Sequence, residues 1–322
     1  MDGHFSDFLI IGAGMAGLAC ATELIHAGAE VAVLDKGRGP GGRMAARRVE
    51  IGGAVVSFDH GAQYFTARDP AFRETVAAWQ AAGVVARWRA AGEDAWVGVP
   101  GMNAPIRMMA TSEGRPLDVR WGVRAERLMR DGARWLVETG DASFGAAKVL
   151  VAVPAEQAKV LLAEVAPALC ALAGSVESAP CWAVMAGFAE RLPAAADTFR
   201  SATAPISWAA RNSAKPGRGG DETWVIHASP ARSREIVDWP KDEAARALLA
   251  DFFAATGIPT AVPIHSDAHR WLYAFPEPLA GEGARFDPET GIGIAGDYLH
   301  SPRIEGAWLS GRALAGLVLA AG

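Results

Sequence analysis

Residues 8–35 read FLIIGAGMAGLACATELIHAGAEVAVLD, and this stretch decides the predicted fold. An apolar run (8–11) is followed by the glycine-rich turn 12–17 and by residues of helical character that Gly28 can end. A second β-rich run follows at 30–34. A strand, a glycine turn, a helix and a second strand in this order predict the first unit of a Rossmann-type parallel sheet.

The glycine turn has the spacing G-x-G-x-x-G. Such a turn lets the backbone approach a pyrophosphate that rests on the N–H groups of the helix N-terminus. Asp35 ends the unit, where a carboxylate can hold a ribose hydroxyl; an acid there argues against a 2′-phosphate at this site. The sequence therefore predicts a dinucleotide bound by Gly12, Gly14, Met15, Ala16, Gly17 and Asp35.

The next stretch, LDKGRGPGGRMAARR (34–48), is basic and rich in glycine. A unit that binds only NAD has no need for this loop, whereas glycines let the chain pass close to a longer ligand. Arginines here can offset the charge of a pyrophosphate, although a solvated basic loop is the simpler alternative. We predict FAD, with contacts from Lys36, Arg38, Gly42, Arg43 and Met44.

A second glycine-rich segment, GIGIAGD (291–297), lies near the end of the sequence and precedes a closing helix. The Asp297 carboxylate can accept a hydrogen bond from a ribityl hydroxyl. The positive N-terminus of the last helix can face the N1–C2=O edge of a flavin. An ordinary strand, loop and capped helix is the alternative. The predicted contacts here are Gly296, Asp297, Ile304 and Gly306.

The composition is that of a globular protein with a large core. Of 322 residues, 51% are hydrophobic and 21% charged, and the formal net charge is −5. These values exclude a disordered chain and a globally basic nucleic-acid-binding protein, so locally placed arginines must hold any anionic ligand. Three cysteines fit neither a disulfide framework nor a zinc site, and we predict no metal. The beginning lacks the features of a signal peptide, which predicts a cytoplasmic protein that neither spans nor binds a membrane.

From about Cys181 the pattern changes to short, tryptophan-rich runs such as CWAVMAGF, TWVIHAS and AHRWLYAF, which are typical of an antiparallel sheet. We predict an α/β protein with two domains. The FAD-binding domain is discontinuous and comprises 1–68, 100–165 and 275–322. A second, α+β substrate domain built on the antiparallel sheet comprises 69–99 and 166–274.

Several longer motifs resemble a known family. Asp35 with GGRM (41–44) resembles the second FAD signature of the flavin amine-oxidase superfamily, whose FAD-binding domains are of the p-hydroxybenzoate hydroxylase type. Five further motifs resemble the bacterial renalases: FDHGAQYFTARD (58–69), WVGVPGM (96–102), WAARNSAKP (208–216), AHRWLYA (268–274) and EGAWLSG (305–311).

The resemblance implies site residues at the matching positions. Implied FAD contacts are Met15, Asp35, Arg43, Gly61, Ala62, Gln63, Val123, Asp297 and Ile304. Implied substrate contacts are Tyr64, Phe65, Thr66, Ala67, Arg68, Trp96, Val97, Gly98, Cys181 and Arg303. At Cys181 the sequence departs from the family, which has threonine; a thiol donates a weaker hydrogen bond, so the substrate preference at this point stays open. His269, beside Arg270 in AHRWLYA, is a further candidate.

No acid–base dyad, catalytic triad or metal cluster is evident, which fits one type of reaction. A dihydropyridine that loses hydride becomes an aromatic pyridinium, so no proton must be removed. The resemblance implies oxidation of 2- or 6-dihydro isomers of β-NAD(P)H to NAD(P)+, with hydride passing to flavin and O2 reduced to H2O2, as metabolite repair. Which of the two isomers is preferred, and whether the substrate is the NADH or the NADPH form, stays open. Arg68, Arg270 and Arg303 are candidates for holding this anionic substrate.

Two alternatives remain. A flavin amine oxidase of the same superfamily acts on a small amine and usually carries a pair of aromatic residues and a lysine near flavin N5. None of the five lysines falls in the late flavin-facing stretches. A non-catalytic protein that has lost FAD and binds lipidated GTPases is disfavoured by Asp35, Arg43 and Asp297. No cysteine lies in the C-terminal stretch where some amine oxidases attach FAD, so we expect non-covalent FAD.

Overall fold

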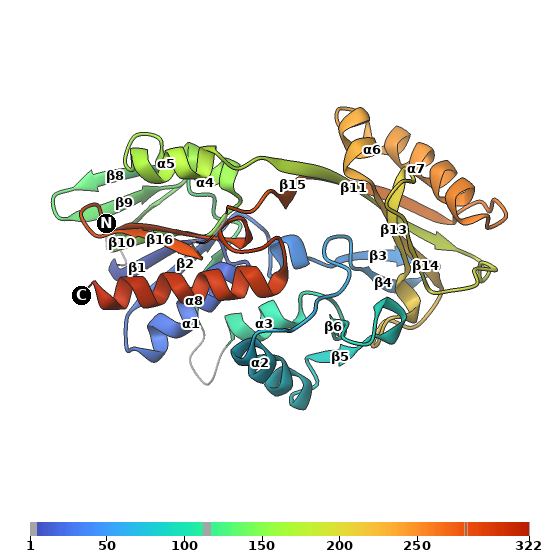
Figure 1. Ribbon diagram of the computed structural model, residues 1–322, viewed down its shortest axis with the longest axis horizontal. Helices are drawn as coiled ribbons and strands as arrows, with labels where there is room; N and C mark the ends of the chain where they lie inside the picture. The colour runs from blue at the N-terminus through green and yellow to red at the C-terminus, as the bar shows by residue number, and fades with distance from the viewer. Residues whose placement is uncertain (1–4, 112–116, 280, 282, 322) are drawn as a thin grey trace.

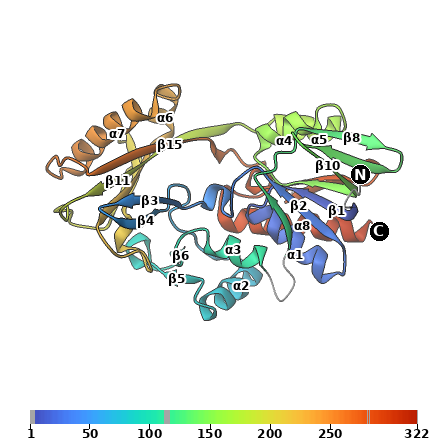
Figure 2. The ribbon, with the colours of Figure 1, turned by 180° about the vertical axis from the view of Figure 1, so that it is seen from behind.

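The computed structural model describes residues 5–111, 117–279, 281 and 283–321, and it has two lobes (Figure 1). A mainly parallel sheet with α1 and α8 forms one lobe, and an antiparallel sheet with α6 and α7 forms the other. The long strands β11 and β15 connect the lobes along one side. The reverse view in Figure 2 shows the hairpin β3–β4 against the antiparallel sheet.

The first lobe is built on an eight-stranded sheet of order β16-β17-β10-β1-β2-β7, with the hairpin β8–β9 attached to β10. Its parallel strands come from both ends of the chain, as the sequence predicts. The strands are β1 (Phe5–Ile11), β2 (Val31–Asp35), β7 (Asp118–Trp121), β8 (Arg127–Asp131), β9 (Arg134–Glu138), β10 (Ser143–Val151), β16 (Ala284–Asp287) and β17 (Ile292–Ala295).

Helices cover both faces of this sheet, because successive strand residues point to opposite sides. Ile10 packs toward α1 (Met15–His26) and α8 (Ile304–Ala320), whereas Leu9 packs toward α4 (Ala155–Leu162) and α5 (Pro167–Gly174). α1 and α8 cross closely: a Cβ at Gly311 would lie 2.0 Å from the carbonyl oxygen of Ala16. The last helix is thereby fixed against the helix that follows the first glycine turn.

The second lobe is the predicted antiparallel sheet, of order β12-β13-β14-β11-β15. α6 and α7 cover one face, where Trp182 and Trp224 pack as core residues. The bounds are β11 (Ser178–Phe188), β12 (Thr198–Arg200), β13 (Ile206–Arg211), β14 (Glu222–Ala228), β15 (His265–Pro276), α6 (Pro230–Glu235) and α7 (Lys241–Thr256).

The remaining elements of the fold are short: β3 (Arg47–Ile51), β4 (Ala54–Phe58), α2 (Pro70–Ala81), β5 (Val85–Arg87), β6 (Trp96–Gly98) and α3 (Ala104–Ala110). The Asp69 carboxylate caps α2 by accepting from the N–H groups of Ala71 and Phe72, and Pro70 occupies the first helical position. Phe72 packs on Trp308 of α8, with ring centroids 5.1 Å apart. The segment 69–99, predicted for the substrate domain, thus shares the hydrophobic cluster of α1 and α8.

The α/β class with its antiparallel second sheet is confirmed, and the domain boundaries stay a prediction. Residues 1–4, 112–116, 280, 282 and 322 of the predicted ranges lie outside the described residues. Within the described part, no helix has both the length and the apolar character needed to cross a bilayer. The cytoplasmic location stays a prediction as well.

Candidate functional site

The glycines of the first turn (12–17) have two different roles, packing of the backbone and open space for a ligand. Gly12 has φ +109°, and a Cβ there would lie 2.4 Å from the carbonyl oxygen of Ala152. A Cβ at Gly17 would lie 1.8 Å from the Gly12 carbonyl oxygen, whereas a Cβ at Gly14 would meet nothing within 4 Å. Packing therefore requires Gly12 and Gly17, and the open space at Gly14, the N-cap of α1, fits the approach of a pyrophosphate.

The Asp35 carboxylate stands beside this turn at the end of β2. One oxygen accepts from Ala13 N–H and the other from Gly37 N–H, both at 2.7 Å. Burial raises the pKa of Asp35, although these two hydrogen bonds oppose the rise. The loop after β7 returns here, because Val123 N–H donates to the Asp35 carbonyl at 2.9 Å. Asp35 and Val123, both predicted to contact FAD, are thus neighbours.

Arg43 and Asp297 meet across 254 residues of sequence. The guanidinium donates to both carboxylate oxygens, at 2.7 and 2.6 Å. This bidentate pair joins the basic glycine-rich loop 34–48 to the turn after β17. The Arg43 guanidinium, predicted to offset the charge of the pyrophosphate, thus also binds a carboxylate of the protein. Arg38, in the same loop, is exposed, and Lys36 donates to Gln157 at 2.7 Å.

The loop 61–63 lies directly on Arg43. Ala62 N–H donates to the Arg43 carbonyl at 2.8 Å, and a Cβ at Gly61 would lie 2.1 Å from that oxygen. Gln63 points its side chain into the protein, where the amide donates to the carbonyls of Gly61 (3.0 Å) and Asp59. An FAD contact at Gln63 must therefore come from its backbone.

One row of side chains crosses the antiparallel sheet on the face opposite α6 and α7. Strand register pairs Arg200 with Trp208, Trp208 with His227, His227 with Ala183, and Ala183 with His269. Paired residues share a sheet face, so these five side chains form a continuous strip, which we call the cross-sheet row. Cys181 and Trp271 pair next to it.

Segment 60–64 lies along the cross-sheet row. The His60 ring lies 5.0 Å from that of His269 and 5.1 Å from that of Trp271. At the other end the Tyr64 ring lies 5.3 Å from Trp208. The fold thus brings Gly61, Ala62, Gln63 and Tyr64 to the strip that contains His269.

The histidines here are neutral at physiological pH. Burial lowers the pKa of His60 to about 3 and that of His227 to about 4. For His269, burial and the nearby Arg47 guanidinium lower the pKa to about 4. None of the three is a ready proton donor near pH 7, which agrees with a site without an acid–base dyad. Burial also raises the pKa of the Cys181 thiol to about 12, so Cys181 is protonated.

These shifts predict that the protein becomes less stable in mild acid. An unfolded histidine takes up a proton near its ordinary pKa of 6.5, whereas folded His60 and His227 do so only near 3 and 4. Stability is therefore lost as pH falls from about 6.5, by roughly 2 kcal/mol for each group at pH 5. Urea unfolding at pH 7 and pH 5 measures the free energy of unfolding. The decrease between the two pH values should be smaller in His227→Gln than in the wild type, by roughly 2 kcal/mol. Replacement of the exposed His300 is the control, and an equal loss in His227→Gln would contradict the expectation.

The remaining predicted substrate residues divide into two groups. Phe65, Trp96 and Val97 are buried in the cluster that contains α1 and α8, and Phe65 pairs with Trp96 through two backbone hydrogen bonds. Their side chains pack in the core, and Gly98 is buried beside them. Exposed or half-exposed are Thr66, Ala67, Arg68 and Arg303.

Arg270 does not face this site. Its guanidinium donates to the carbonyl of Val237 and lies near the ring of Trp182, on the side of the sheet covered by the helices. The alternation of side chains along β15 explains this, because neighbouring His269 and Trp271 point the other way. Arg270 is therefore no longer a candidate for holding substrate.

Sequence reasoning missed several positioning residues. The buried Glu305 carboxylate accepts the N–H groups of Arg68 (2.6 Å) and Asp69 (2.7 Å), fixing segment 64–69 to the start of α8. Lys215 is fully buried and donates to the Gln63 amide oxygen at 3.1 Å and to Asp59 at 3.2 Å. These partners are far apart in sequence, so no local motif could identify them.

Comparison with known families agrees with this geometry. A family model for NAD(P)-binding Rossmann-like domains matches residues 10–79. A second, described as flavin containing amine oxidoreductase, matches residues 81–319, about three quarters of the chain. The chain belongs to the flavin-containing amine oxidoreductase family.

Solved structures of similar fold include three oxidases. A putative protoporphyrinogen oxidase from Exiguobacterium sp. 255-15 superposes with a TM-score of 0.76 at 13% identity, over 97% of this chain and 98% of that one. Wild-type putrescine oxidase bound to putrescine gives 0.72 at 14% identity, over 98% and 99%. Cyclohexylamine oxidase from Brevibacterium oxydans IH-35A gives 0.63 at 14%, over 97% and 98%. At these identities the likeness shows the fold.

As a member of the flavin-containing amine oxidoreductases, the protein is an FAD-dependent oxidoreductase, and its FAD is non-covalent, as predicted. The glycine turn with open space at Gly14, the Asp35 carboxylate and the Arg43–Asp297 pair fit this cofactor. Which of the individual residues contact FAD and substrate stays a prediction.

Proposed function

We propose that the protein is a renalase-like oxidase that converts 2- or 6-dihydro isomers of β-NAD(P)H to NAD(P)+. The observation that carries this proposal is the charge around the cross-sheet row. Arg200 stands at one end with no carboxylate partner among the described residues, and Arg68 and Arg303, two arginines of the predicted substrate set, are exposed. Four carboxylates of the candidate site are already engaged by cations or N–H groups: Asp59, Asp267, Asp297 and Glu305. Such a site favours an anionic substrate over a cationic one.

When bound, FAD supplies hydride acceptance and returns the electrons to O2 as H2O2. The chain's own residues need only bind, orient and exclude water. Tyr64, Trp208 and Trp271 offer ring faces to a planar heterocycle. Neutral His60, His227 and His269 provide polar groups without a proton to give at pH 7. This set suits oxidation of a dihydropyridine, which releases no proton.

We assign Arg200 a role in holding the substrate's phosphates. Its guanidinium donates to the Tyr64 hydroxyl at 2.8 Å and lies over the Trp208 ring at 4.9 Å. In contrast, Arg211 on the neighbouring strand forms ion pairs with both Asp197 and Glu222. Arg200 therefore keeps donors for an anion while the two rings fix its position.

Arg200→Gln is expected to raise KM for the dihydro dinucleotides about tenfold, with kcat little changed, because one charged contact to phosphate is lost. Steady-state peroxide formation measures both constants. Arg191→Gln, a change of the same charge away from the row, should leave KM unchanged. A KM in Arg200→Gln equal to that of the wild type would remove Arg200 from the substrate site.

The activity itself is tested by anaerobic stopped-flow mixing of the yellow holoprotein with chemically reduced NAD+ that contains the 2- and 6-dihydro isomers. Rapid loss of flavin absorbance near 450 nm, and its return with stoichiometric H2O2 on admission of O2, is the expected result. Ordinary 4-dihydro NADH should bleach the flavin far more slowly. Failure of all dihydro isomers to bleach the flavin would refute the proposal.

Amine oxidation is the second candidate, and one observation favours it. Lys215, not expected near the flavin, is buried beside Gln63, and burial lowers its pKa to about 8. Two neighbours of similar fold are named for amine substrates, putrescine oxidase and cyclohexylamine oxidase. Peroxide from putrescine or cyclohexylamine, without bleaching by the NADH isomers, would make this candidate the function.

A further inference from the structure

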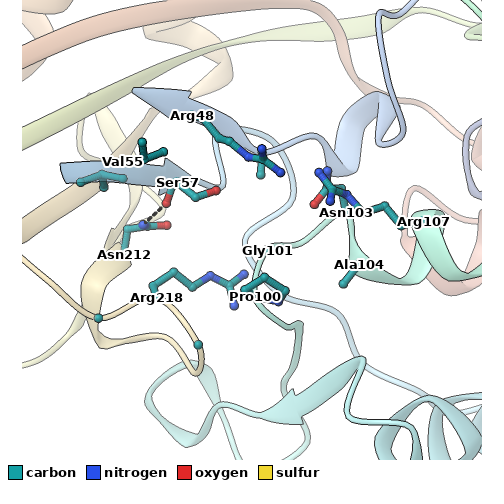
Figure 3. Close-up of a pocket in the computed structure, with 14 residues that line it drawn as sticks. Arg48, Val55, Ser57, Pro100, Gly101, Asn103, Ala104, Arg107, Asn212 and Arg218 are labelled. Carbon is teal, nitrogen blue, oxygen red and sulfur yellow. Dashed lines mark hydrogen bonds between the residues drawn. The ribbon is translucent and has the colours of Figure 1, made fainter. Parts of the chain in front are cut away.

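A cavity of about 350 Å³ opens between the β3–β4 hairpin, the loop 100–101, α3 and the loop 217–219 (Figure 3). None of its lining residues belongs to the predicted cofactor or substrate sets. The hairpin separates it from the cross-sheet row: Arg47 binds Asp267 and lies 3.3 Å from His269, whereas the adjacent Arg48 lines the cavity. Side chains of successive strand residues point to opposite faces, so the cavity lies behind the candidate active site.

The cavity is strongly basic. Arg48, Arg107 and Arg218 line it, and no aspartate or glutamate does, although the chain as a whole has a net charge of −5. In Figure 3, Arg48 extends from β3 toward Asn103 and Arg107 on the α3 side, and Arg218 extends toward Pro100. The exposed side chains of Arg48 and Arg107 have no ion-pair partner within the described residues. An acidic protein that gathers unpaired guanidinium groups around one cavity creates a local site for an anion.

Arg218 adds a buried donor. It is 8% exposed, and its Nη2 donates to Asp59, yet its Nε has no hydrogen-bond partner. A buried N–H without an acceptor is costly, and it is satisfied when a ligand supplies the acceptor, directly or through water. Asn212, also in the lining, is held in place by donating to the Ser57 carbonyl at 2.8 Å. Arg218 and Asn212 are thus held in place in the lining.

Apolar side chains are interspersed with the arginines in the lining: Ala46, Val55, Val56 and Pro100. Val55 is 72% exposed and leaves apolar surface open to a ligand. A volume in the range of small-molecule sites, with both basic and apolar side chains in the lining, suits a ligand that has both a phosphate and an organic body. We propose that this cavity binds a phosphate ester of nucleotide size.

Two sources of such a ligand exist: the far end of a dinucleotide substrate, or a free nucleotide. In either case Arg218 connects the cavity to the loop 61–63. Arg218 and Lys215 both donate to Asp59, and Lys215 also donates to Gln63 of that loop. Binding of the nucleotide is independent of the proposed reaction, so it can be tested even if the dihydro isomers are not turned over.

Isothermal titration calorimetry of the FAD-loaded protein with 5′-AMP tests the proposal. Wild type is expected to bind AMP, and the double variant Arg48→Gln/Arg107→Gln is expected to bind it about 10- to 100-fold more weakly, because two guanidinium contacts to phosphate are lost. Adenosine, which lacks the phosphate, should bind weakly to both. Both arginines are exposed, so their replacement should leave the thermal unfolding temperature unchanged.

The charge-matched variant Arg234→Gln/Arg246→Gln, with both changes on α6 and α7, is the control and should retain AMP binding. Equal AMP affinity in the wild type and Arg48→Gln/Arg107→Gln, or equal affinity for AMP and adenosine in the wild type, would overturn the proposal. If AMP competes with the dinucleotide substrate, the cavity holds the far end of that substrate; if both bind together, it holds a free nucleotide.

Discussion

Gly17→Ala is expected to yield a protein that neither folds stably nor retains FAD, whereas Gly14→Ala is expected to fold normally and still lose the cofactor. A Cβ at Gly17 would lie 1.8 Å from the Gly12 carbonyl oxygen, between two backbone segments that cannot yield. At Gly14 the same atom meets no protein atom within 4 Å, so only a ligand can clash with it. The second glycine of such turns serves the approach of pyrophosphate, and the third serves the packing of helix on strand.

Two measurements distinguish these outcomes. Thermal unfolding of the FAD-free proteins should show Gly14→Ala close to the wild type and Gly17→Ala destabilised by about 2 kcal/mol or more, the scale of an overpacked core. Flavin titration should then show an FAD affinity in Gly14→Ala lower by about two orders of magnitude. Tight FAD binding by Gly14→Ala would contradict the assignment of this turn to the cofactor.

Asp59→Asn is expected to destabilise the protein by about 3–5 kcal/mol, the usual cost of removing one partner from a buried ion pair. Asp59 is 0% exposed and is the common acceptor for Lys215 and Arg218, whose side chains are 0% and 2% exposed. The charges of these two partners lower the pKa of Asp59 despite its burial. Asparagine leaves both cations without a counter-charge, and we expect the Gln63 loop and FAD affinity to be lost with it.

The chain offers a matched control for this change. Asp267 also accepts from two cations, Arg47 and Lys241, but these are 36% and 63% exposed. Asp267→Asn should therefore cost about 1 kcal/mol or less. Urea unfolding measures both variants at pH 7, and adding Lys215→Met to Asp59→Asn should recover part of the loss. Equal destabilisation by Asp59→Asn and Asp267→Asn would contradict the expectation that burial makes the Asp59 ion pairs more costly to break.

The structure also changes how the two candidate reactions are compared. In the sequence, the absence of a lysine from the late glycine-rich stretches weighed against amine oxidation. The fold brings Lys215 to Gln63 from an unrelated loop, so this argument no longer holds. The preference for an anionic substrate now depends on Arg200 and on the engaged carboxylates, and turnover of the amines compared with that of the NADH isomers distinguishes the two reactions.

Much of the fold was predictable because its signals are local. Alternation of apolar residues, glycine turns and caps depend on neighbours a few residues apart, and the Rossmann unit at 8–35 and the Asp69–Pro70 helix start follow from them. The antiparallel sheet follows in the same way from its short tryptophan-rich runs. The helix α5 and the hairpin β5–β6 were missed, since each is short and has weak periodicity of its own.

The features of the candidate site also differ in whether they depend on residues that are neighbours in sequence. The sequence by itself indicated the type of cofactor, because the glycine turn, Asp35 and the basic glycine-rich loop 34–48 lie close together in the chain. Only the tertiary structure decided the partners: Arg43 with Asp297, Asp59 with Lys215 and Arg218, and Glu305 with the backbone of Arg68. The register of five strands places Arg200 in one row with His269. Ion pairs, buried charges and sheet register join residues that are distant in sequence, so they exist only once the chain has folded.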